Sequence, residues 1–398
     1  MRASLRAAAI HTARAVYALN WFDISPALIY ISRQLDLSIP QLGLMTTGFY
    51  IGLATFQLLG GILASRLGNR LTATLGISIL GLASIVTGLS QDLPELFASR
   101  FFAGMGSAFF FSPALGSLSE IVPRDRYTVH VGIYNGAFNI GAGTGVLGWA
   151  YLDRIMSWRI TMSLGGALAL ALGAVSYVAL MGVSEHRSVG RALSSNLKRV
   201  VASRYLWIVP VAGIAPMVAE TITGQFMVYY LETGLHSGTA TAGTVSSLFL
   251  FLGFIGGLVG GMQFQRTRRK MGTFIAVLVL TGALLVAVAL LRNIYAVSLS
   301  LVAMGMLTVD GFSILYAIAA FFVHDRSMVS FSLAFVNFMQ QVLSIAFPFA
   351  FTYVDALSGY TPAWLSMAAI SFAALPLLAL VGKGELRRLG QWRRAEGG

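Results

Sequence analysis

Long apolar stretches recur along the whole chain and constrain its fold more than any other feature. A helix that crosses the ~30 Å hydrocarbon core of a bilayer needs about 20 consecutive, mostly apolar residues. Twelve such stretches can be traced, of which the fifth and the eleventh are the least hydrophobic. We therefore predict an all-α membrane protein with twelve transmembrane helices, at residues 10–31, 41–64, 71–90, 95–118, 128–150, 159–182, 205–231, 240–263, 272–291, 294–322, 328–352 and 362–382.

The composition agrees with a chain that lies mostly in lipid. Of its 398 residues, 57% are hydrophobic and 11% are charged, whereas soluble proteins average about 25% charged residues. This excludes a water-soluble enzyme for most of the chain, and it excludes intrinsic disorder, which requires low hydrophobicity. The sequence has no cysteine, which excludes disulfides and thiolate metal ligands. His11 and Arg14 interrupt the first apolar stretch, so we interpret it as a transmembrane helix and not as a signal peptide.

Positive charge is concentrated on one side of the predicted membrane. The chain carries 27 Lys and Arg against 15 Asp and Glu, a formal net charge of +12. Twelve spans place 21 of the basic residues in the termini and the loops of one side, and four in the loops of the other. Because cytoplasmic loops are enriched in basic residues, we predict a multi-pass protein of the inner (cytoplasmic) cell membrane with both termini cytoplasmic. Anionic lipid headgroups account for the basic excess, so no nucleic-acid partner is expected.

An internal repeat divides the chain into two halves. Residues 60–70 (GGILASRLGNR) are similar to residues 260–270 (GGMQFQRTRRK), and the Asp-Arg pairs at 125–126 and 325–326 show the same offset of 200. We predict an N-terminal six-helix bundle at 1–183, a cytoplasmic linker at 184–204, and a C-terminal six-helix bundle with a short basic tail at 205–398. Two such halves with a substrate site between them near the bilayer midplane are an architecture of secondary transporters.

Three motifs carry a resemblance to a known family. Residues 60–70 resemble the G-x-L-a-D-r-x-G-r-R loop of the major facilitator superfamily, and residues 100–106 (RFFAGMG) resemble the R-x-x-x-G-x-G element of its fourth span. Trp158-Arg159 lies where the family often has a W-R pair at the start of the sixth span. The resemblance covers the whole chain and implies two pseudo-symmetric six-helix bundles that transport solutes by alternating access. It also implies a gating loop that helps to lock the cytoplasmic side, formed here by Gly61, Ser65, Arg66, Gly68 and Arg70.

Two positions depart from the pattern of that family. The acid of the gating loop is replaced by Ser65, and in the second half by Gln265. A serine can cap a helix N-terminus, but it supplies no charge to the lock. The Gly-Pro motif of the fifth span, which is associated with exporters, lacks its proline in residues 141–148 (GAGTGVLG). This second departure counts against a drug/proton antiporter.

Three acids lie inside predicted spans, namely Asp23, Glu220 and Asp310. An Asp at the centre of a transmembrane helix costs about 2.5–3.5 kcal/mol, so such residues normally face the protein interior or a partner. Burial disfavours the charged form of a carboxyl group. A carboxyl group that gains and loses a proton as its surroundings alternate between wet and dry is what proton coupling requires. We therefore interpret the three acids as proton-coupling or cation-binding residues, and the alternative is a structural role in hydrogen bonds between helices.

The resemblance also places these acids near a central cavity. In the family, spans 1, 4, 7 and 10 line that cavity, and the three acids fall on three of those spans. Arg100 falls on the fourth. By this analogy Arg100 is a candidate for proton relay or for contact with a substrate anion, and its alternative role is a structural ion pair.

Neutral polar residues of the spans are candidate substrate-binding residues. Helical spacing places Asn20, Asp23 and Tyr30 on one face of the first span, and Pro216 is expected to bend the helix that carries Glu220. Hydrogen bonds between helices, worth about 0.6 kcal/mol each on average, are the alternative role for these side chains. The candidates are Asn20, Tyr30, Asn135, Asn139, Asn337, Gln340 and Gln341.

The function that we predict is secondary active transport. The five His show no metal-ligand spacing and the chain has no nucleophile–base constellation, so we expect no metal, no cofactor and no enzymatic activity. We expect a monomer whose partners are a small-molecule substrate, protons and the lipid bilayer. Proton-coupled symport of a small organic solute is the first interpretation, and three acids against one central arginine favour a neutral, zwitterionic or cationic solute. Export of drugs or amphiphilic metabolites by proton antiport is the second interpretation, and a non-transporting membrane receptor or scaffold is the alternative from another class.

Overall fold

The computed structural model describes residues 3–183, 201–267, 269–322 and 329–381. Within these ranges the chain is almost entirely helical and contains no β-strand. The helices are α1 (Ala3–Trp21), α2 (Ile24–Leu35), α3 (Ile39–Leu67), α4 (Asn69–Leu89), α5 (Leu93–Ile121), α6 (Arg124–Leu152), α7 (Trp158–Ala179), α9 (Arg204–Ala212), α10 (Ala215–Thr233), α11 (Thr239–Arg266), α12 (Lys270–Leu290), α13 (Ile294–Phe321), α14 (Val329–Ser344), α15 (Ala346–Ser358), α16 (Tyr360–Ala374) and the 3-10 helix η2 (Leu375–Leu380).

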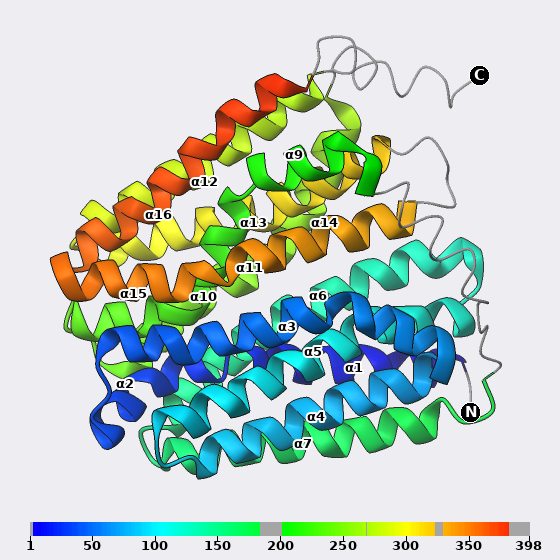
Figure 1. The fold of residues 1–398 in the computed structure, drawn as a ribbon, viewed down its shortest axis with the longest axis horizontal. Helices are drawn as coiled ribbons and strands as arrows, with labels where there is room; N and C mark the ends of the chain where they lie inside the picture. Colours follow the sequence, from blue (N-terminus) through cyan, green and yellow to red (C-terminus); the bar gives the residue numbers. More distant parts are fainter. Residues whose placement is uncertain (1–2, 184–200, 268, 323–328, 382–398) are drawn as a thin grey trace.

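The helices form two bundles that lie against each other, one from α1 to α7 and one from α9 to η2 (Figure 1). In the first bundle α5 packs against α3 and α4, and α7 packs against α4 and α1. In the second bundle α13 packs against α11 and α12, and α16 packs against α12 and α15. Most of the predicted linker at 184–204 falls on residues 184–200, outside the described residues. We call the end of the molecule where α1 begins and η2 finishes the termini end, and the opposite end the α2 end (Figure 1).

Most of the predicted membrane crossings have the length and composition that a bilayer requires. Nine helical segments of the described residues qualify, and the bent pair formed by α9 and α10 makes a tenth. The two remaining crossings of the predicted twelve correspond to α1 with α2 and to α6. Their sequences carry polar and basic residues, such as Arg14 in α1 and Asn135 and Asn139 in α6. These polar side chains reduce the mean hydropathy of their helices, and they face the cavity between the bundles.

Three of the described crossings are interrupted, one of them at Ile345 between α14 and α15. α1 ends at Trp21 and α2 begins at Ile24, so Phe22 and Asp23 lie at a break in the first crossing. In the second bundle α9 and α10 meet at an angle of 47°. The break follows from Pro216, which has no backbone N–H and cannot continue the hydrogen-bond ladder of the helix. The Gly213 carbonyl beside this break accepts a hydrogen bond from the Gln340 amide at 3.4 Å.

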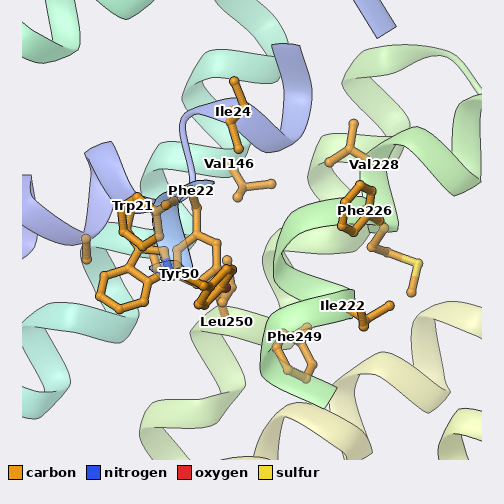
Figure 2. Packing of buried hydrophobic residues seen from close by; sticks show 14 of the residues in the cluster. Trp21, Phe22, Ile24, Tyr50, Val146, Ile222, Phe226, Val228, Phe249 and Leu250 are labelled. Atoms are coloured by element: carbon orange, nitrogen blue, oxygen red, sulfur yellow. The ribbon is translucent and has the colours of Figure 1, made fainter. Parts of the chain in front are cut away.

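The two bundles contact each other through α2 with α10, α3 with α14 and α15, and α6 with α11. Toward the α2 end these contacts are tight, and a cluster of large side chains fills the space between the bundles (Figure 2). The Phe22 ring packs so closely on Gly224 of α10 that a Cβ at Gly224 would lie 2.4 Å from it. Tyr30 of α2 and Thr239 of α11 also join the bundles by a hydrogen bond of 3.2 Å. Toward the termini end, the ribbons of α3 and α14 diverge (Figure 1). The packing of Phe22 on Gly224 and the hydrogen bond between Tyr30 and Thr239 therefore hold the bundles together at the α2 end.

Candidate functional site

A cavity of about 270 Å³ lies between the two bundles. Its volume is close to the lower end of the ~300–1,000 Å³ that is usual for small-molecule sites. Four helices of each bundle contribute to its wall. The lining residues are Arg14, Tyr17 and Trp21 of α1; Tyr50, Leu53 and Gln57 of α3; Phe111 of α5; Gly132, Asn135, Gly136, Phe138 and Asn139 of α6; Met217 and Glu220 of α10; Phe254, Gly257 and Leu258 of α11; Val309, Phe312, Ser313 and Tyr316 of α13; and Asn337, Gln340 and Gln341 of α14.

Aromatic rings close this cavity toward the α2 end. The Trp21 ring lies 4.8 Å from the Phe49 ring and 5.8 Å from the Phe138 ring, measured between centroids. Phe22 lies 6.0 Å from Phe138 on the same basis. Figure 2 shows Trp21, Phe22 and Tyr50 of the first bundle facing Ile222 and Phe226 of the second. A solute in the cavity therefore has a packed aromatic layer on its α2 side.

Arg14 is a buried cation on the cavity wall. Its side chain is 5% exposed, and its guanidinium carbon lies 4.4–4.9 Å from the ring centroids of Tyr17, Phe111, Tyr134 and Phe138. Nε and Nη1 have no hydrogen-bond partner among the described residues. Each cation–π contact stabilises the charge by about 0.5–2 kcal/mol, whereas the removal of an ion from water costs several kcal/mol. The rings offset part of the cost of burial, but the N–H groups at Nε and Nη1 of Arg14 remain without acceptors among the described residues.

Glu220 faces the same cavity from the second bundle. Its carboxyl group is half-buried on α10 and lies within electrostatic range of Arg14 and of the hydroxyl groups of Tyr17, Tyr50 and Tyr316. Among the described residues that line the cavity, Arg14 and Glu220 are the two that carry a formal charge. A direct ion pair is recorded between Asp23 and Arg100 and none between Arg14 and Glu220. The cavity therefore presents one cation and one anion from opposite bundles.

Amide side chains form the rest of the polar wall. The Gln57 Nε2 donates to Asn337 Oδ1 at 3.1 Å, which joins the two bundles, and Asn337 Nδ2 donates to the Tyr316 hydroxyl at 2.9 Å. The Oε1 atoms of Gln340 and Gln341 are buried without a partner within the described structure. Of the candidate substrate-binding residues, the structure places five on the cavity wall: Asn135, Asn139, Asn337, Gln340 and Gln341.

Asp23 and Arg100 lie away from the cavity and bind each other. The Arg100 Nη1 donates to Asp23 Oδ1 at 3.1 Å, and the Ser84 hydroxyl donates to the second carboxylate oxygen at 3.3 Å. Both charged side chains are almost fully buried, with 0% and 2% exposed. Arg100 also lies 5.0 Å from the Phe49 ring centroid. The geometry is that of a structural ion pair, which is the alternative role that the sequence analysis gave for Arg100.

Three further candidates are also outside the cavity lining. Asn20 is fully buried and its Nδ2 donates to the Val16 carbonyl at 2.8 Å. Tyr30 lies on α2, whereas Asn20 lies on α1. Because the crossing is broken after Trp21, the two residues do not share one continuous helical face, and the prediction that they do is wrong. Asp310 packs against Gly260 of α11, with a carboxylate oxygen 2.1 Å from where a Cβ of Gly260 would lie. It therefore faces α11 within its own bundle.

The predicted gating loop is a tight connection between α3 and α4. Gly68 adopts φ +91°, in the left-handed region that favours glycine. Ser65 does not cap α4, because its hydroxyl donates to the Ile62 carbonyl of its own helix at 2.7 Å. An acid from another helix reaches the loop instead, since Asn69 Nδ2 donates to Glu120 Oε1 at 2.9 Å. The remaining members of the loop are Gly61 and Arg66 on α3 and Arg70 on α4, whose guanidinium lies 4.9 Å from the Tyr177 ring.

The sequence analysis missed Arg14 as a site residue. A charged residue in an apolar span was visible in the sequence, and we used it only to argue against a signal peptide. The aromatic residues around it, Tyr17, Phe111 and Phe138, gave no separate signal because aromatic residues are frequent throughout the spans.

Two helical bundles with a shared polar cavity between them have the architecture that is typical of secondary transporters. The comparison with protein families agrees, because the model of the Major Facilitator Superfamily matches residues 10–348. The chain belongs to that superfamily. The prediction of a major facilitator fold is thereby confirmed.

Several curated relatives that the chain matches are named as transport proteins. The chain is 28% identical to the 4-hydroxybenzoate transporter PcaK of Pseudomonas aeruginosa over 240 residues, 59% of this chain and 51% of the relative. It is 25% identical to the inner membrane transport protein YdhP of Escherichia coli K12 over 309 residues, 73% of this chain and 75% of the relative. For the first relatives, including PcaK, the match spans about half of their length.

Among solved structures, a bacterial homolog of the human lysosomal transporter Spinster, in an inward-facing and occupied conformation, superposes with a TM-score of 0.79 at 15% identity. That alignment covers 96% of this chain and 98% of the homolog. A D-xylose–proton symporter superposes with a TM-score of 0.75 at 14% identity over 96% of this chain and 98% of that chain. At these identities the likeness concerns the fold.

Proposed function

We propose that this protein is a proton-coupled symporter of a small organic solute. The solute binds in the cavity between the bundles, and the bundles rock about it to expose the cavity to one side of the membrane and then to the other. The protein works as a monomer in the cytoplasmic membrane, with the termini end on the cytoplasmic side. The excess of basic residues in the termini and the loops of that side supports this orientation.

The observation that carries the proposal is the position of Glu220. It is a half-buried acid on the wall of a cavity that both bundles line. An acid in such a place is in contact with water when the cavity is open and is desolvated when the cavity is closed. Alternation between these states moves a proton together with the solute. Asp23 is less suited to this role because Arg100 neutralises it, and Asp310 is less suited because it faces α11.

Alternating access requires that the contacts at the α2 end break and re-form. The hydrogen bond between Tyr30 and Thr239, and the packing of Phe22 on Gly224, join the bundles there. Both are compact contacts between side chains or between a ring and a glycine, with no ion pair to separate. A rocking motion of this kind is the usual way in which inverted-repeat transporters expose a fixed site.

The names of the relatives do not agree on one solute. They include a 4-hydroxybenzoate transporter, a nitrite extrusion protein of Bacillus subtilis and a methylenomycin A resistance protein of Streptomyces coelicolor. We therefore base the proposed function on the cavity and leave the solute at the level of a small organic molecule.

Lumenal pH in proteoliposomes tests the proposal. Sugars, amino acids, organic acids and lipophilic cations are added outside vesicles that contain the full chain and a pH-sensitive dye. Lumenal acidification with one solute is the expected result, and Glu220→Gln is expected to abolish it while Glu95→Gln, a change at an exposed acid, leaves it unchanged. Solute counterflow without any change in pH, in the parent protein and in both variants, would overturn proton coupling.

Export by proton antiport is the second candidate function. The observation that favours it is the aromatic lining of the cavity, which includes Trp21, Phe111, Phe138, Phe254 and Phe312. Such a wall suits amphiphilic compounds, and some relatives are named for antibiotic resistance. The same vesicle experiment separates the two functions, because antiport makes the lumen alkaline when the exported solute is added outside.

A further inference from the structure

Arg14 is a buried cation whose guanidinium can bind an anion in the cavity. Arg14 is 5% exposed, and it lies on the wall of the cavity. The four rings that surround it hold the cation by their faces, and the Tyr17 hydroxyl is a hydrogen-bond partner of the Arg14 side chain. Nε and Nη1 of Arg14 nevertheless have no hydrogen-bond partner within the described structure. A carboxylate supplies two coplanar acceptors that match two N–H groups of a guanidinium.

The wall beyond Arg14 restricts the body of such an anion. Phe111 and Phe138 line the cavity beside Arg14, and Phe254 and Phe312 line it on the second bundle. A flat, apolar body can stack on these rings. The Gln341 Oε1, buried without a partner, provides one acceptor for a polar substituent. The volume of about 270 Å³ leaves room for a molecule of about one ring.

The charged and titratable groups near Glu220 determine the electrostatic environment of a bound monoanion. From α1 they are Arg14 and the hydroxyl of Tyr17, from α3 the hydroxyl of Tyr50, and from α13 the hydroxyl of Tyr316. The residues of α11 and α14 that line the cavity, such as Gln340, carry no formal charge. With Glu220 ionised the described cavity wall is neutral, and with Glu220 protonated it carries one positive charge, that of Arg14.

We propose that the cavity takes an organic monocarboxylate with a flat apolar body, that Arg14 binds its carboxylate, and that the Glu220 carboxylate is the internal competitor of the solute for Arg14. This inference rests on the proposed function, since it names the solute class of the same cavity. A proton that binds Glu220 removes the competing anion, and the solute carboxylate then supplies the negative charge beside Arg14. One proton and one monoanion enter together, so the net charge of the cavity is the same before and after loading.

The inference reverses an expectation from the sequence. Three acids against one arginine favoured a neutral, zwitterionic or cationic solute. In the structure, however, Asp23 is paired with Arg100, and Asp310 faces α11. The balance in the cavity is one acid against one arginine. A solute that brings one negative charge together with a proton preserves that balance and satisfies the unpaired donors of Arg14.

Calorimetric binding to the full chain in lipid nanodiscs tests the role of Arg14. The probes are benzoate, its neutral analogue benzamide and its cationic analogue benzylamine, at about pH 6, where benzoate is ionised. Binding of benzoate but not of the other two is expected. Arg14→Gln is expected to weaken benzoate binding by about 10- to 100-fold, and Arg14→Lys, which keeps the charge but loses the planar fork, by less. Arg154→Gln, at an exposed arginine, is the matched control and is expected to bind as the parent does.

The pH dependence of the same binding tests the role of Glu220. Between about pH 6 and pH 8.5 the benzoate affinity of the parent protein is expected to fall with rising pH, by at most about tenfold per pH unit for one linked proton. In Glu220→Gln the affinity is expected to be high and nearly independent of pH, because the competing charge is absent. A purely structural role of Glu220 would lower affinity at every pH, and Glu95→Gln is expected to keep the pH dependence of the parent.

The outcomes separate this inference from the proposed function. If benzylamine or benzamide binds and benzoate does not, or if Arg14→Gln binds benzoate as the parent does, the inference is overturned while symport can still stand on the vesicle assay. If benzoate affinity is the same at every pH in both parent and Glu220→Gln, the competition is overturned. If benzoate binds through Arg14 with the expected pH dependence, yet labelled benzoate is not transported in vesicles beyond the protein-free background, the proposed function fails while the site stands. Size-exclusion elution of each variant at the parent volume establishes that it is folded.

Discussion

The Asp23 carboxylate and the Arg100 guanidinium form a buried ion pair, with Nη1 and Oδ1 3.1 Å apart, at the break between α1 and α2. The pair connects this break to α5 in the same bundle. Because both groups are almost fully buried, each depends on the other for compensation of its charge. The first crossing can therefore be interrupted without leaving an uncompensated acid in the membrane.

Removal of one partner of this pair is expected to be more damaging than removal of both. Asp23→Asn leaves the Arg100 charge buried and should lower the free energy of unfolding by about 3–5 kcal/mol. The double variant Asp23→Asn with Arg100→Gln should recover much of that loss. Thermal unfolding in detergent, followed by the intrinsic fluorescence of the chain, measures both. Equal melting temperatures of the parent and Asp23→Asn would show that the pair does not stabilise the fold.

The sequence predicted the family and much of the fold because apolar length and repeat are properties of the chain alone. It also predicted the bend at Pro216, since a missing N–H has the same effect in any helix. The break at Phe22 and Asp23 was not predictable in this way. Pro26, which lies in the first turn of α2, is compatible with a straight helix that begins there. The interruption depends on Asp23 binding Arg100 and on Phe22 packing against Gly224, contacts between segments far apart in sequence.

The sequence predicts how deep in the membrane the candidate residues lie, but not which of them point into the cavity. Hydropathy places Glu220, Asp310 and Asp23 inside the membrane, yet the rotation of each helix about its axis decides which one faces the cavity. That rotation is set by packing, as Asp310 shows by its contact with Gly260. The amide pairs on α6 and α14 face the cavity because their neighbours on the same helices pack against the opposite bundle. Arg14 was visible as a charge in a span, but its position among four rings on the cavity wall depends on contacts between helices.

The contact between Phe22 and Gly224 is expected to control closure of the α2 end. Gly224→Leu places a side chain where the Phe22 ring lies, so the bundles should separate there. Because the chain has no cysteine, spin labels at cysteines introduced for Arg154 and Leu357, exposed residues of opposite bundles at the α2 end, report the distance directly. The variant should shift the distribution to longer distances, whereas Gly148→Leu, at a glycine with open space around it, should not. An unchanged distribution in Gly224→Leu contradicts the prediction.

Asp153 is expected to make stability depend on pH. This residue follows α6, is 4% exposed, and accepts a hydrogen bond from the Thr161 hydroxyl. Burial raises the pKa of Asp153 from 3.8 to about 7, against the opposing effect of the Thr161 hydrogen bond. The folded state thus binds this proton more tightly than the unfolded state, so the contribution of Asp153 to stability is fully present below about pH 4 and falls as pH rises to about 7.

The variant Asp153→Asn should remove this dependence. Between about pH 4 and pH 7 the melting temperature of the variant should rise relative to that of the parent. The corresponding difference in the free energy of unfolding is on the order of a few kcal/mol. Other acids titrate in both proteins and cancel in the difference. Glu95→Gln, at an exposed acid, serves as the control and should show a constant difference. A constant difference for Asp153→Asn as well would mean that this carboxyl group is ionised in the folded protein throughout the range.

Gly68 is expected to be required for the connection between α3 and α4. Its φ of +91° lies in a region that an L side chain occupies only at a cost of about 1–2 kcal/mol. Gly68→Ala should therefore lower the melting temperature. Gly61→Ala provides the matched comparison seven residues earlier, because Gly61 lies within α3 with open space where a Cβ would be. There the substitution should leave stability unchanged or raise it by up to about 1 kcal/mol, since alanine is the better helix former. Thermal unfolding of the two variants side by side decides the matter, and equal effects at both positions would show that the loop relaxes around an alanine at Gly68.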